Sequence, residues 1–381
     1  MPSSSPDTTP PPFGRFFLPG PTEVRPAVLD AQARPMIGHR GAGIQTLIGS
    51  LQEGLRHVFR TERPVFISTS SATGMMEAGL RNGARARVLS LVNGAFSGRF
   101  SRIALACGFE MEVLEVPWGG HHEPEQVREK LQAGDFLGRP FDAVTVVHSE
   151  TSTGALNDVE AIAAVVRDFP DTVTLVDSVS GVAGAPLHTD RAGFDFVLTG
   201  SQKAFALPPG LSFGVASERL MERSTVATRK GVYFDLMEFA GSMEKLQTPN
   251  TPAVSLFYAL DEQLSSIAGE GGEGIEGRWA RHLAMAEHCW RWVDRMREER
   301  GVALSILAGD VPHRSPTVTC VQLPEDRSGP AIVAAMKERG YVIGGGYGKL
   351  KDESIRIGHM GDHTVEETAE LLDVLEEVLT E

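Results

Sequence analysis

Two residues that follow apolar runs of the chain could do covalent and proton-transfer chemistry. Lys203 comes shortly after the apolar run 194–198, and Asp177 ends the apolar run 173–177. A lysine amine can form a Schiff base with a carbonyl carbon, and a carboxylate can hold a proton on a ring nitrogen. Each alone is weak evidence, because a lone lysine is usually a surface charge and an aspartate at a strand end usually caps a helix.

Three further loops supply groups that complement these two. The segment 69–74, Thr-Ser-Ser-Ala-Thr-Gly, places backbone N–H groups and short hydroxyls at a predicted helix start, which suits a phosphate. Phe96 follows the run 88–92 with an aromatic ring, and the segment 150–154, Glu-Thr-Ser-Thr-Gly, brings a cluster of hydroxyls. Pyridoxal phosphate needs a phosphate cradle, a stacking ring, a donor near its phenolate oxygen, a carboxylate at its ring nitrogen and a lysine. All five groups occur in five successive loops, so we expect this cofactor.

The elements between these loops predict how the groups are brought together. From about Pro35 to Gly200, helical stretches alternate with short runs rich in valine and isoleucine that lack polar alternation. This pattern predicts a mostly parallel sheet with helices on both faces, whose ligands bind beyond the carboxyl ends of the strands. We expect strands at 65–68, 88–92, 143–147, 173–177 and 194–198, and helices at 47–60, 74–81, 98–107 and 159–168.

The rest of the chain predicts a second, smaller α+β domain after a Gly/Glu-rich linker at 269–274. Its expected elements are helices at 278–300 and 365–380 and short strands at 317–322 and 354–357. The division that we expect is a disordered arm (1–15), an N-terminal segment packing near the active site and the small domain (16–35), a large domain that binds the cofactor (36–265) and a small C-terminal domain (266–381).

The composition narrows the class of protein. At 381 residues the chain has the length of two or three domains, and 41% hydrophobic with 23% charged residues is typical of a globular protein. The formal net charge of −14 disfavours nucleic acid as a partner. No apolar run approaches the roughly 18 residues of a membrane helix, and the Pro/Ser-rich start lacks the features of a secretory signal. Three widely spaced cysteines fit a reducing compartment, so we expect a cytoplasmic protein without membrane partners.

Two other segments resemble ligand sites without meeting their requirements. The glycine-rich segment 344–349 resembles a phosphate loop, but Leu350 stands where a serine or threonine would hold magnesium, so we expect a turn. The segment His121-His122-Glu123 lacks the i, i+4 spacing of metal ligands on a helix. We expect a solvated loop there, and no metal site in the protein.

Several motifs together resemble the class V pyridoxal-phosphate aminotransferases of fold type I, and within them the alanine–glyoxylate and serine–pyruvate branch. The resemblance covers nearly the whole chain, from residue 18 to the last predicted helix. It implies a mostly parallel central sheet flanked by helices, a smaller α+β C-terminal domain, and a homodimer. The motifs are Leu-Pro-Gly-Pro-Thr (18–22), Pro-Met-Ile-Gly-His (35–39), Glu-Thr-Ser-Thr-Gly (150–154), Val-Asp-Ser-Val (176–179), Gly-Ser-Gln-Lys-Ala (200–204), Pro-Pro-Gly (208–210), Thr-Pro-Ala (251–253) and Ile-Arg-Ile-Gly (355–358).

The resemblance implies a role for each candidate residue. Lys203 matches the lysine that carries the cofactor, and Asp177 matches the carboxylate at its ring nitrogen. Arg356 matches the arginine that holds the substrate α-carboxylate, a bidentate task, with Gly20 beside the substrate. Thr251 matches a phosphate contact made by the second subunit, which would place the active site at a dimer interface. The other implied cofactor contacts are Ser71, Ala72, Thr73 and Gln202 at the phosphate, Phe96 and Val179 on the two ring faces, and Thr151 near the phenolate.

Three positions depart from the family pattern. Phe96 stands where some relatives have tryptophan, so stacking is kept without a tryptophan-specific contact. Thr73 occupies a position that can carry a ring-contacting histidine. Arg40 stands where some relatives have no arginine, and it is either a solvated charge or a contact for a second acidic group of the substrate.

The fold also hosts lyases of the cysteine desulfurase and kynureninase type, which are the alternative class of enzyme. A desulfurase needs a cysteine on a mobile loop, whereas Cys320 falls in a predicted strand. A non-catalytic protein of this fold is disfavoured because Lys203, Asp177 and Arg356 are all present. We therefore expect an aminotransferase.

The sequence says least about the substrates. We expect a small amino donor, alanine or serine, and glyoxylate or pyruvate as the 2-oxo acid acceptor, because Arg356 is the single carboxylate contact with a clear place in the motifs. Aspartate or phosphoserine is the alternative donor, for which Arg40, Arg229 or Lys230 would add positive charge for a second anionic group.

Overall fold

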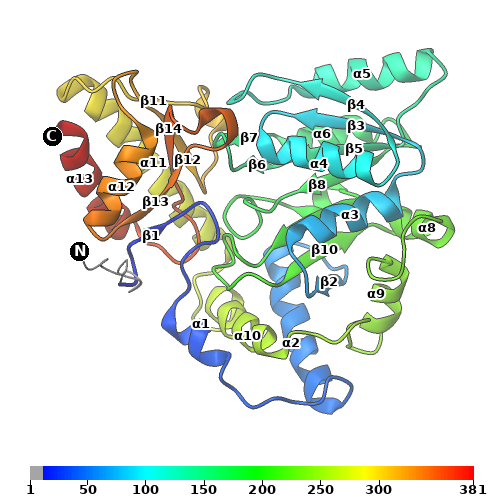
Figure 1. The fold of residues 1–381 in the computed structure, drawn as a ribbon. Coiled ribbons are helices and arrows are strands. Elements are labelled where there is room, and N and C mark those ends of the chain that lie inside the picture. The colour runs from blue at the N-terminus through cyan, green and yellow to red at the C-terminus, as the bar shows by residue number, and fades with distance from the viewer. Residues whose placement is uncertain (1–11) are drawn as a thin grey trace, which may run out of the picture.

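The computed structural model describes residues 12–381, and a seven-stranded sheet forms the centre of its larger part (Figure 1). The strand order is β2-β10-β9-β8-β5-β3-β4, and all strands are parallel except β10, which runs antiparallel to both of its neighbours. Five of the seven strands are buried along their whole length, because helices cover both faces. The bounds are β2 (Val65–Ser68), β3 (Arg87–Val92), β4 (Glu110–Glu115), β5 (Ala143–Val147), β8 (Val173–Asp177), β9 (Phe196–Gly200) and β10 (Ser212–Ala216).

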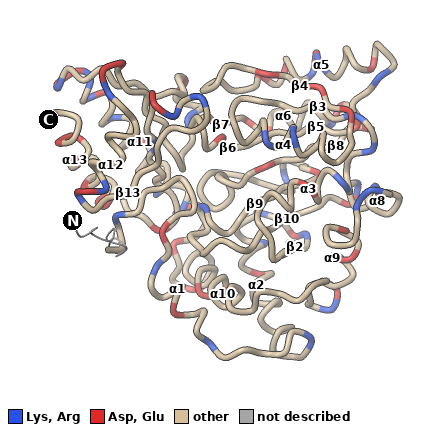
Figure 2. Tube along the Cα trace, in the orientation of Figure 1, with Lys and Arg blue, Asp and Glu red and all other residues tan. Residues whose placement is uncertain are grey.

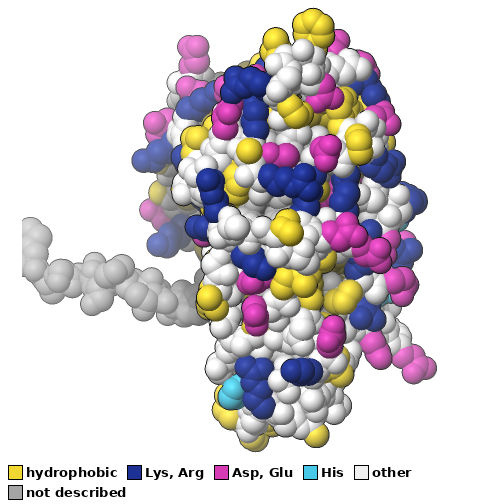
Figure 3. Space-filling view, turned by 90° about the vertical axis from the view of Figure 1, so that its right-hand side faces the viewer, with side chains coloured by type: hydrophobic (Ala, Val, Ile, Leu, Met, Phe, Trp, Pro, Cys, Tyr) yellow, Lys and Arg dark blue, Asp and Glu magenta, His cyan; other side chains and the backbone are white. Residues whose placement is uncertain are grey.

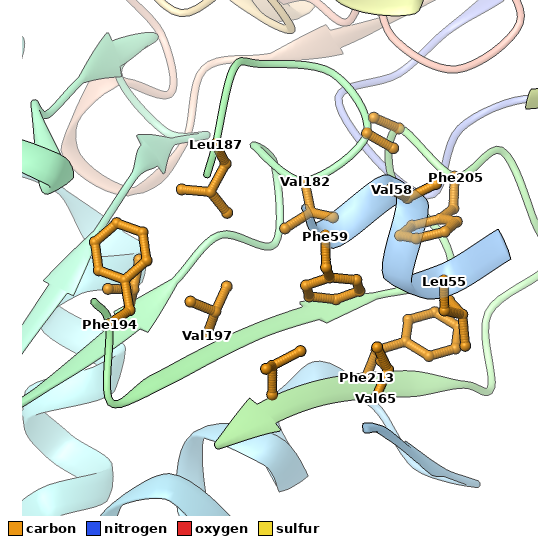
Figure 4. Packing of buried hydrophobic residues seen from close by; sticks show 14 of the residues in the cluster. Leu55, Val58, Phe59, Val65, Val182, Leu187, Phe194, Val197, Phe205 and Phe213 are labelled. Carbon is orange, nitrogen blue, oxygen red and sulfur yellow. The ribbon is translucent and has the colours of Figure 1, made fainter. Parts of the chain in front are cut away.

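Two apolar clusters lie on the two faces of this sheet, and neighbouring strand residues alternate between them. Val65 belongs to one cluster and Phe66 to the other. Figure 4 shows part of the first, in which Leu55 and Phe59 lie near Val65 and Phe213. The first cluster includes α2 (Ala42–Phe59), α5 (Pro124–Phe136), α6 (Val159–Val166) and α10 (Val254–Ala268), and the second includes α3 (Ala72–Gly83), α4 (Ala95–Ala106), α8 (Glu218–Val226) and α9 (Leu236–Met243).

A second, five-stranded sheet has the order β1-β13-β14-β12-β11. It packs with three helices around a separate apolar cluster, at the left of Figure 1. The N-terminal strand β1 pairs in parallel with β13, and this pairing brings the following residues toward the large sheet. The bounds are β1 (Phe16–Phe17), β11 (Ser305–Ile306), β12 (Thr319–Gln322), β13 (Val342–Gly345), β14 (Ser354–Ile357), α11 (Ile275–Glu299), α12 (Gly329–Glu338) and α13 (Val365–Thr380).

The remaining elements are short. They are α1 (Pro26–Ala31), the hairpin of β6 (Ser149–Glu150) and β7 (Ala155–Leu156), α7 (Thr189–Ala192), and the single 3₁₀ turns Val311–His313 and Gly348–Leu350. The glycine-rich segment 344–349 therefore ends a strand and begins a turn, as the sequence predicts.

Every strand and helix expected from the sequence is present, with shifts at the ends. The prediction missed β10, because Ser-Phe-Gly-Val-Ala has a central glycine and no clear apolar run. It also missed β4, whose sequence Glu-Met-Glu-Val-Leu-Glu alternates because it is an edge strand exposed on one side. The expectation of a solvated loop at 121–123 was wrong for His122. Its ring is buried, and burial lowers its pKa to about 4.

Residues 1–11 of the expected disordered arm lie outside the described residues. The end of the arm joins the small sheet, since Gly14 N donates to Glu23 Oε2 (2.7 Å) and Val342 N donates to Arg15 O (2.9 Å). The domain boundaries at 36 and 266 stay a prediction. Among the described residues, no helix combines the length and the apolar character that crossing a bilayer requires.

The acidic excess is not collected in one segment of the molecule. Acidic and basic residues are interspersed along the trace (Figure 2). The same mixture covers the face seen in Figure 3, where positive and negative side chains lie among apolar ones.

Candidate active site

A cavity of about 130 Å³ lies beyond the carboxyl ends of β5, β8 and β9, where a parallel sheet binds its ligands. Its walls include every residue that the sequence predicts to contact the cofactor within its own chain. A larger open hollow of about 690 Å³ between α2 and α7 contains none of them. The cavity is lined by Ser71, Ala72, Thr73, Met76, Phe96, Arg99, Val147, Ser149, Thr151, Asp177, Val179, Gln202 and Lys203.

Lys203 lies at the bottom of this cavity, just after β9. Its side chain is buried, and its Nζ donates a hydrogen bond to the carbonyl of Pro19. Burial lowers the pKa of the amine to about 7, and the positive charge of Arg356 adds to the shift. An amine with this pKa is neutral in a large fraction of molecules near pH 7, which a nucleophile and a base both require.

The N-terminal segment packs directly on this lysine. Gly20 has a φ of +105°, and a Cβ added there would overlap the Lys203 side chain, so no other residue fits without displacement. The lysine loop is held from two sides, because Thr22 N donates to Gln202 O (3.0 Å) and Arg278 Nη2 donates to Ala204 O (2.7 Å). The buried Arg278 comes from α11 of the small part, and the sequence analysis did not identify it.

Asp177 ends β8, the strand next to β9, and it lines the same cavity. Its carboxylate is buried and accepts one hydrogen bond from the backbone N of Val179 (2.9 Å). Burial raises the pKa of this carboxyl to about 7 and the negative charge of Glu150 adds to the rise, although Lys203 and Arg99 oppose it. A cation placed beside it would relieve that cost, and a protonated ring nitrogen is such a cation.

The start of α3 forms the end wall of the cavity and suits an anion. Ser71 is the N-cap residue and makes no capping hydrogen bond with its side chain, so N–H groups of the first turn stay available. These groups and the positive end of the helix dipole favour a phosphate, with the hydroxyl of Thr73 nearby. The phosphate cradle, the lysine and the carboxylate thus lie around one small cavity, as pyridoxal phosphate requires.

Phe96 is held in place by a buried carboxylate that the sequence analysis left without a role. Glu150 belongs to β6 and is fully buried, and its carboxylate reaches the start of α4. There its Oε2 accepts hydrogen bonds from the backbone N of Phe96 (3.1 Å) and of Ser97 (2.8 Å). A Cβ at Gly94 would overlap the Glu150 side chain, so this approach depends on the glycine. The Phe96 ring then faces the lysine, with Lys203 Nζ 5.9 Å from its centroid.

Arg356 joins the small sheet to the mouth of the cavity. From β14, its Nε donates to Gly345 O (2.8 Å) and its Nη1 donates to Thr151 O (3.2 Å). Within residues 12–381 it has no carboxylate partner, so its charge is available to a substrate carboxylate. The hydroxyl oxygen of Thr151 is hydrogen-bonded to Oγ of Ser180, at 2.6 Å.

Arg99 and Tyr347 also lie at this mouth and were missed by the sequence analysis. Arg99 Cζ lies 4.9 Å from the centroid of the Phe96 ring, one helical turn after it, and Arg99 Nη2 contacts the Tyr347 hydroxyl at 3.4 Å. The spacing of three residues between Phe96 and Arg99 on a predicted helix was the only available signal.

Thr251 and Arg40 do not reach the cavity of their own chain. Arg40 donates to the carbonyl of Thr248 (2.8 Å), so it is bound to the loop that presents Thr251. The other two candidate cations also have partners elsewhere, since Arg229 donates to Gly108 O (2.8 Å) and Lys230 lies 3.0 Å from a carboxylate oxygen of Asp235.

The three cysteines are all buried, which does not fit the reactive cysteine that a desulfurase needs. Cys320 lies in β12, and burial raises the pKa of its thiol to about 11. A persulfide carrier needs a reactive thiolate on an accessible loop, and no cysteine of the chain has that environment.

Comparison with known proteins identifies the family. The model of the family "Aminotransferase class-V" matches residues 32–305, which include the phosphate cradle, Asp177 and Lys203. The chain belongs to the class V aminotransferases. A class V aminotransferase was expected from the sequence motifs, and this expectation is confirmed.

Relatives of this class V aminotransferase match it along nearly its whole length. An uncharacterized aminotransferase of Methanocaldococcus jannaschii is 38% identical over 91% of the chain and 87% of the relative. The structure of an alanine–glyoxylate aminotransferase from Nostoc sp. has a TM-score of 0.88 at 30% identity, covering 99% of the chain and 97% of that structure. A subgroup IV aspartate aminotransferase from Thermus thermophilus has a TM-score of 0.85 at 31% identity, covering 96% and 99%. The fold is thus fold type I, as the sequence predicts.

The buried lysine leads to a first testable prediction about stability. In the cofactor-free protein, we expect Lys203 to make the free energy of unfolding increase as the pH rises from about 7 to 10.5. In this range the unfolded chain binds a proton at the lysine that the folded protein does not, and raising the pH removes that advantage of the unfolded state. Urea unfolding of the wild type and of Lys203→Met at several pH values measures the difference. Equal pH slopes in the two proteins would show that Lys203 titrates normally.

Proposed function

We propose that this class V aminotransferase uses pyridoxal phosphate to move an amino group from a small amino acid, alanine or serine, to glyoxylate or pyruvate. One observation carries the proposal: Lys203, Asp177 and the start of α3 surround a single cavity, and Arg356 reaches its mouth with no carboxylate partner in residues 12–381. The similarity to an alanine–glyoxylate aminotransferase supports the substrate class.

Each residue has a defined task in this proposal. Pyridoxal phosphate, when bound, supplies a ring that accepts the electron pair left on the substrate when its α-proton departs. Lys203 Nζ would carry the cofactor between turnovers and, once released from it, remove the α-proton and deliver a proton on the same face. Its pKa of about 7 suits both directions of transfer. Asp177 would keep the ring nitrogen protonated, and Phe96 and Val179 would hold the two faces of the ring.

Arg356 would orient the donor. Its guanidinium can hold an α-carboxylate with two parallel hydrogen bonds, a geometry that a lysine cannot reproduce. The two carbonyl oxygens that it contacts, of Gly345 and Thr151, fix the plane of the group before substrate arrives. The α-carbon is thereby placed between Arg356 and Lys203.

A second candidate donor is aspartate or phosphoserine. Arg99 favours it, because this half-buried cation lines the cavity and forms no ion pair with a carboxylate of the described residues. The similarity to an aspartate aminotransferase points the same way. Arg40 would serve this substrate only from a second subunit, since it does not reach the cavity of its own chain.

A donor panel decides between the two candidates. Alanine, serine, aspartate, glutamate and phosphoserine are each measured against glyoxylate, pyruvate and 2-oxoglutarate. The small-donor proposal predicts the highest kcat/KM for alanine or serine with glyoxylate or pyruvate. A preference for aspartate or phosphoserine of 100-fold, about 3 kcal/mol in transition-state terms, would overturn it. In that case Arg99→Ala and Arg40→Ala show which arginine supports the preference.

We also propose that the active unit is a homodimer. Thr251 is exposed and lies near Tyr233, away from the cavity of its own chain, and both Val232 (84%) and Tyr233 (46%) are exposed as well. Exposed apolar side chains around a predicted cofactor contact are expected at a subunit interface. Three unpaired cysteines support a cytoplasmic location as part of the same proposal.

The dimer proposal predicts that Thr251→Ala weakens cofactor binding. Loss of one hydrogen bond to a phosphate should raise the Kd by about 10- to 150-fold, because a hydrogen bond to a charged group contributes about 1.5–3 kcal/mol. Thr225→Ala, at another exposed threonine, should leave the Kd unchanged. Ultracentrifugation combined with assays at falling protein concentration tests the dimer itself, and a fully active monomer would contradict it.

A further inference from the structure

Tyr347 stands at the mouth of the active-site cavity, directly after β13. Its ring centroid lies 5.3 Å from that of Phe96 and 5.4 Å from the Cζ of Arg356. Its hydroxyl lies 3.4 Å from Nη2 of Arg99. Tyr347 is 36% exposed, so part of its side chain is open to solvent. No motif identified in the sequence includes this residue as a site residue.

The turn that carries Tyr347 is fastened to both parts of the molecule. On the small part, Leu350 N donates to Tyr347 O (3.1 Å), and Gly346 N donates to Ser354 O (2.9 Å) of β14. On the large part, Lys349 Nζ lies 4.6 Å from the centroid of the Trp118 ring. These contacts fix the turn between the two parts of the molecule, and the ring contacts with Phe96 and Arg356 place the Tyr347 side chain beside the cavity mouth.

The position of a donor in this mouth follows from the proposed function, on which this inference rests. The α-carboxylate lies on Arg356, and the amino group must approach the place of Lys203 Nζ, 5.9 Å from the Phe96 centroid. The α-carbon is therefore bounded by Arg356, Lys203 and Phe96. Tyr347 contacts the first and the last of these three residues, so it closes the space between them through which a donor side chain would extend.

We infer that Tyr347 is a specificity-determining residue that sets the upper size limit of the donor side chain. Its ring leaves room for the one-carbon side chains of alanine and serine and meets longer or branched ones. Its hydroxyl contacts Nη2 of Arg99 at 3.4 Å. The side chain thus favours small donors by its volume.

A series of unbranched donors tests the size limit. The ratio of kcat/KM for norvaline to that for alanine is measured in the wild type, Tyr347→Ala and Tyr347→Phe. One methylene in a pocket changes kcat/KM by about 10- to 200-fold, so opening the wall in Tyr347→Ala should raise this ratio at least about tenfold. Tyr347→Phe keeps the ring and loses only the hydroxyl, so its ratio should stay within about threefold of the wild type.

Binding of carboxylates without an amino group supplies a readout that does not depend on turnover. Calorimetry with the cofactor-loaded protein compares propionate and pentanoate, which place a carboxylate on Arg356 but cannot react. Tyr347→Ala should tighten pentanoate binding relative to propionate, whereas Tyr347→Phe should not. A norvaline-to-alanine ratio and a relative pentanoate affinity that are both unchanged in Tyr347→Ala overturn the inference. A wild type without activity on alanine and serine overturns the proposed function instead.

Discussion

Replacing Lys203 by alanine should lower the kcat for transamination by about 10³-fold or more. The replacement removes the amine that would carry the cofactor and also the base that moves the α-proton, and general acid–base catalysis alone contributes about 10²- to 10⁴-fold. Among the described residues, Lys203 is the one lysine that lines the cavity, so no other amine is placed to replace it. Single-turnover absorbance changes of the cofactor-loaded protein with alanine measure the loss.

Two controls distinguish chemistry from folding. Lys203→Arg keeps a positive charge but has a pKa far too high to release a proton, so it should be as inactive as the alanine variant. Lys245→Ala, at an exposed lysine, should keep wild-type activity. Borohydride reduction of the loaded wild type followed by peptide mapping should locate the cofactor on Lys203, and a label on any other lysine would falsify the assignment.

Asp177→Asn should keep the cofactor bound but lower kcat by about 10²- to 10³-fold. An amide has no charge to hold a proton on the ring nitrogen, and a preorganised charge interaction in a buried site contributes about 3–4 kcal/mol to the transition state. The carboxylate has one backbone donor, Val179 N at 2.9 Å, so the bound ring is expected to be its main partner. Steady-state rates and the absorbance of bound cofactor measure the two effects separately.

The matched variant for this test is Asp177→Glu. It keeps the charge at the end of β8 but moves it by one methylene, so it should retain more activity than Asp177→Asn. Near-wild-type turnover in Asp177→Asn would remove the carboxylate from the mechanism. Loss of cofactor from Asp177→Asn would assign it a binding role in place of an electronic one.

Local sequence was sufficient to predict five of the seven strands of the large sheet and the chemical groups at its edge. Runs of valine and leucine without polar alternation occur because β5, β8 and β9 are buried on both faces. In a parallel sheet the carboxyl ends of all strands meet on one edge, so Asp177 and Lys203 had to lie near each other once the strands were recognised. The ordered motifs then predicted the family, which the family comparison confirms.

Contacts between distant residues could not be predicted in this way. The pairing of Arg99 with Tyr347 spans 248 positions, and that of Arg278 with Ala204 spans 74, so no local pattern indicates either. In the sequence, Glu150 is one polar residue of a hydroxyl-rich loop, and nothing local indicates that its carboxylate binds the start of α4. Periodicity reports only which side of an element is buried, whereas the partner across the interface depends on how two separate sheets pack. That packing brings Arg356, Tyr347 and Gly20 together beside the cavity, which is why no local pattern in the sequence could place them there.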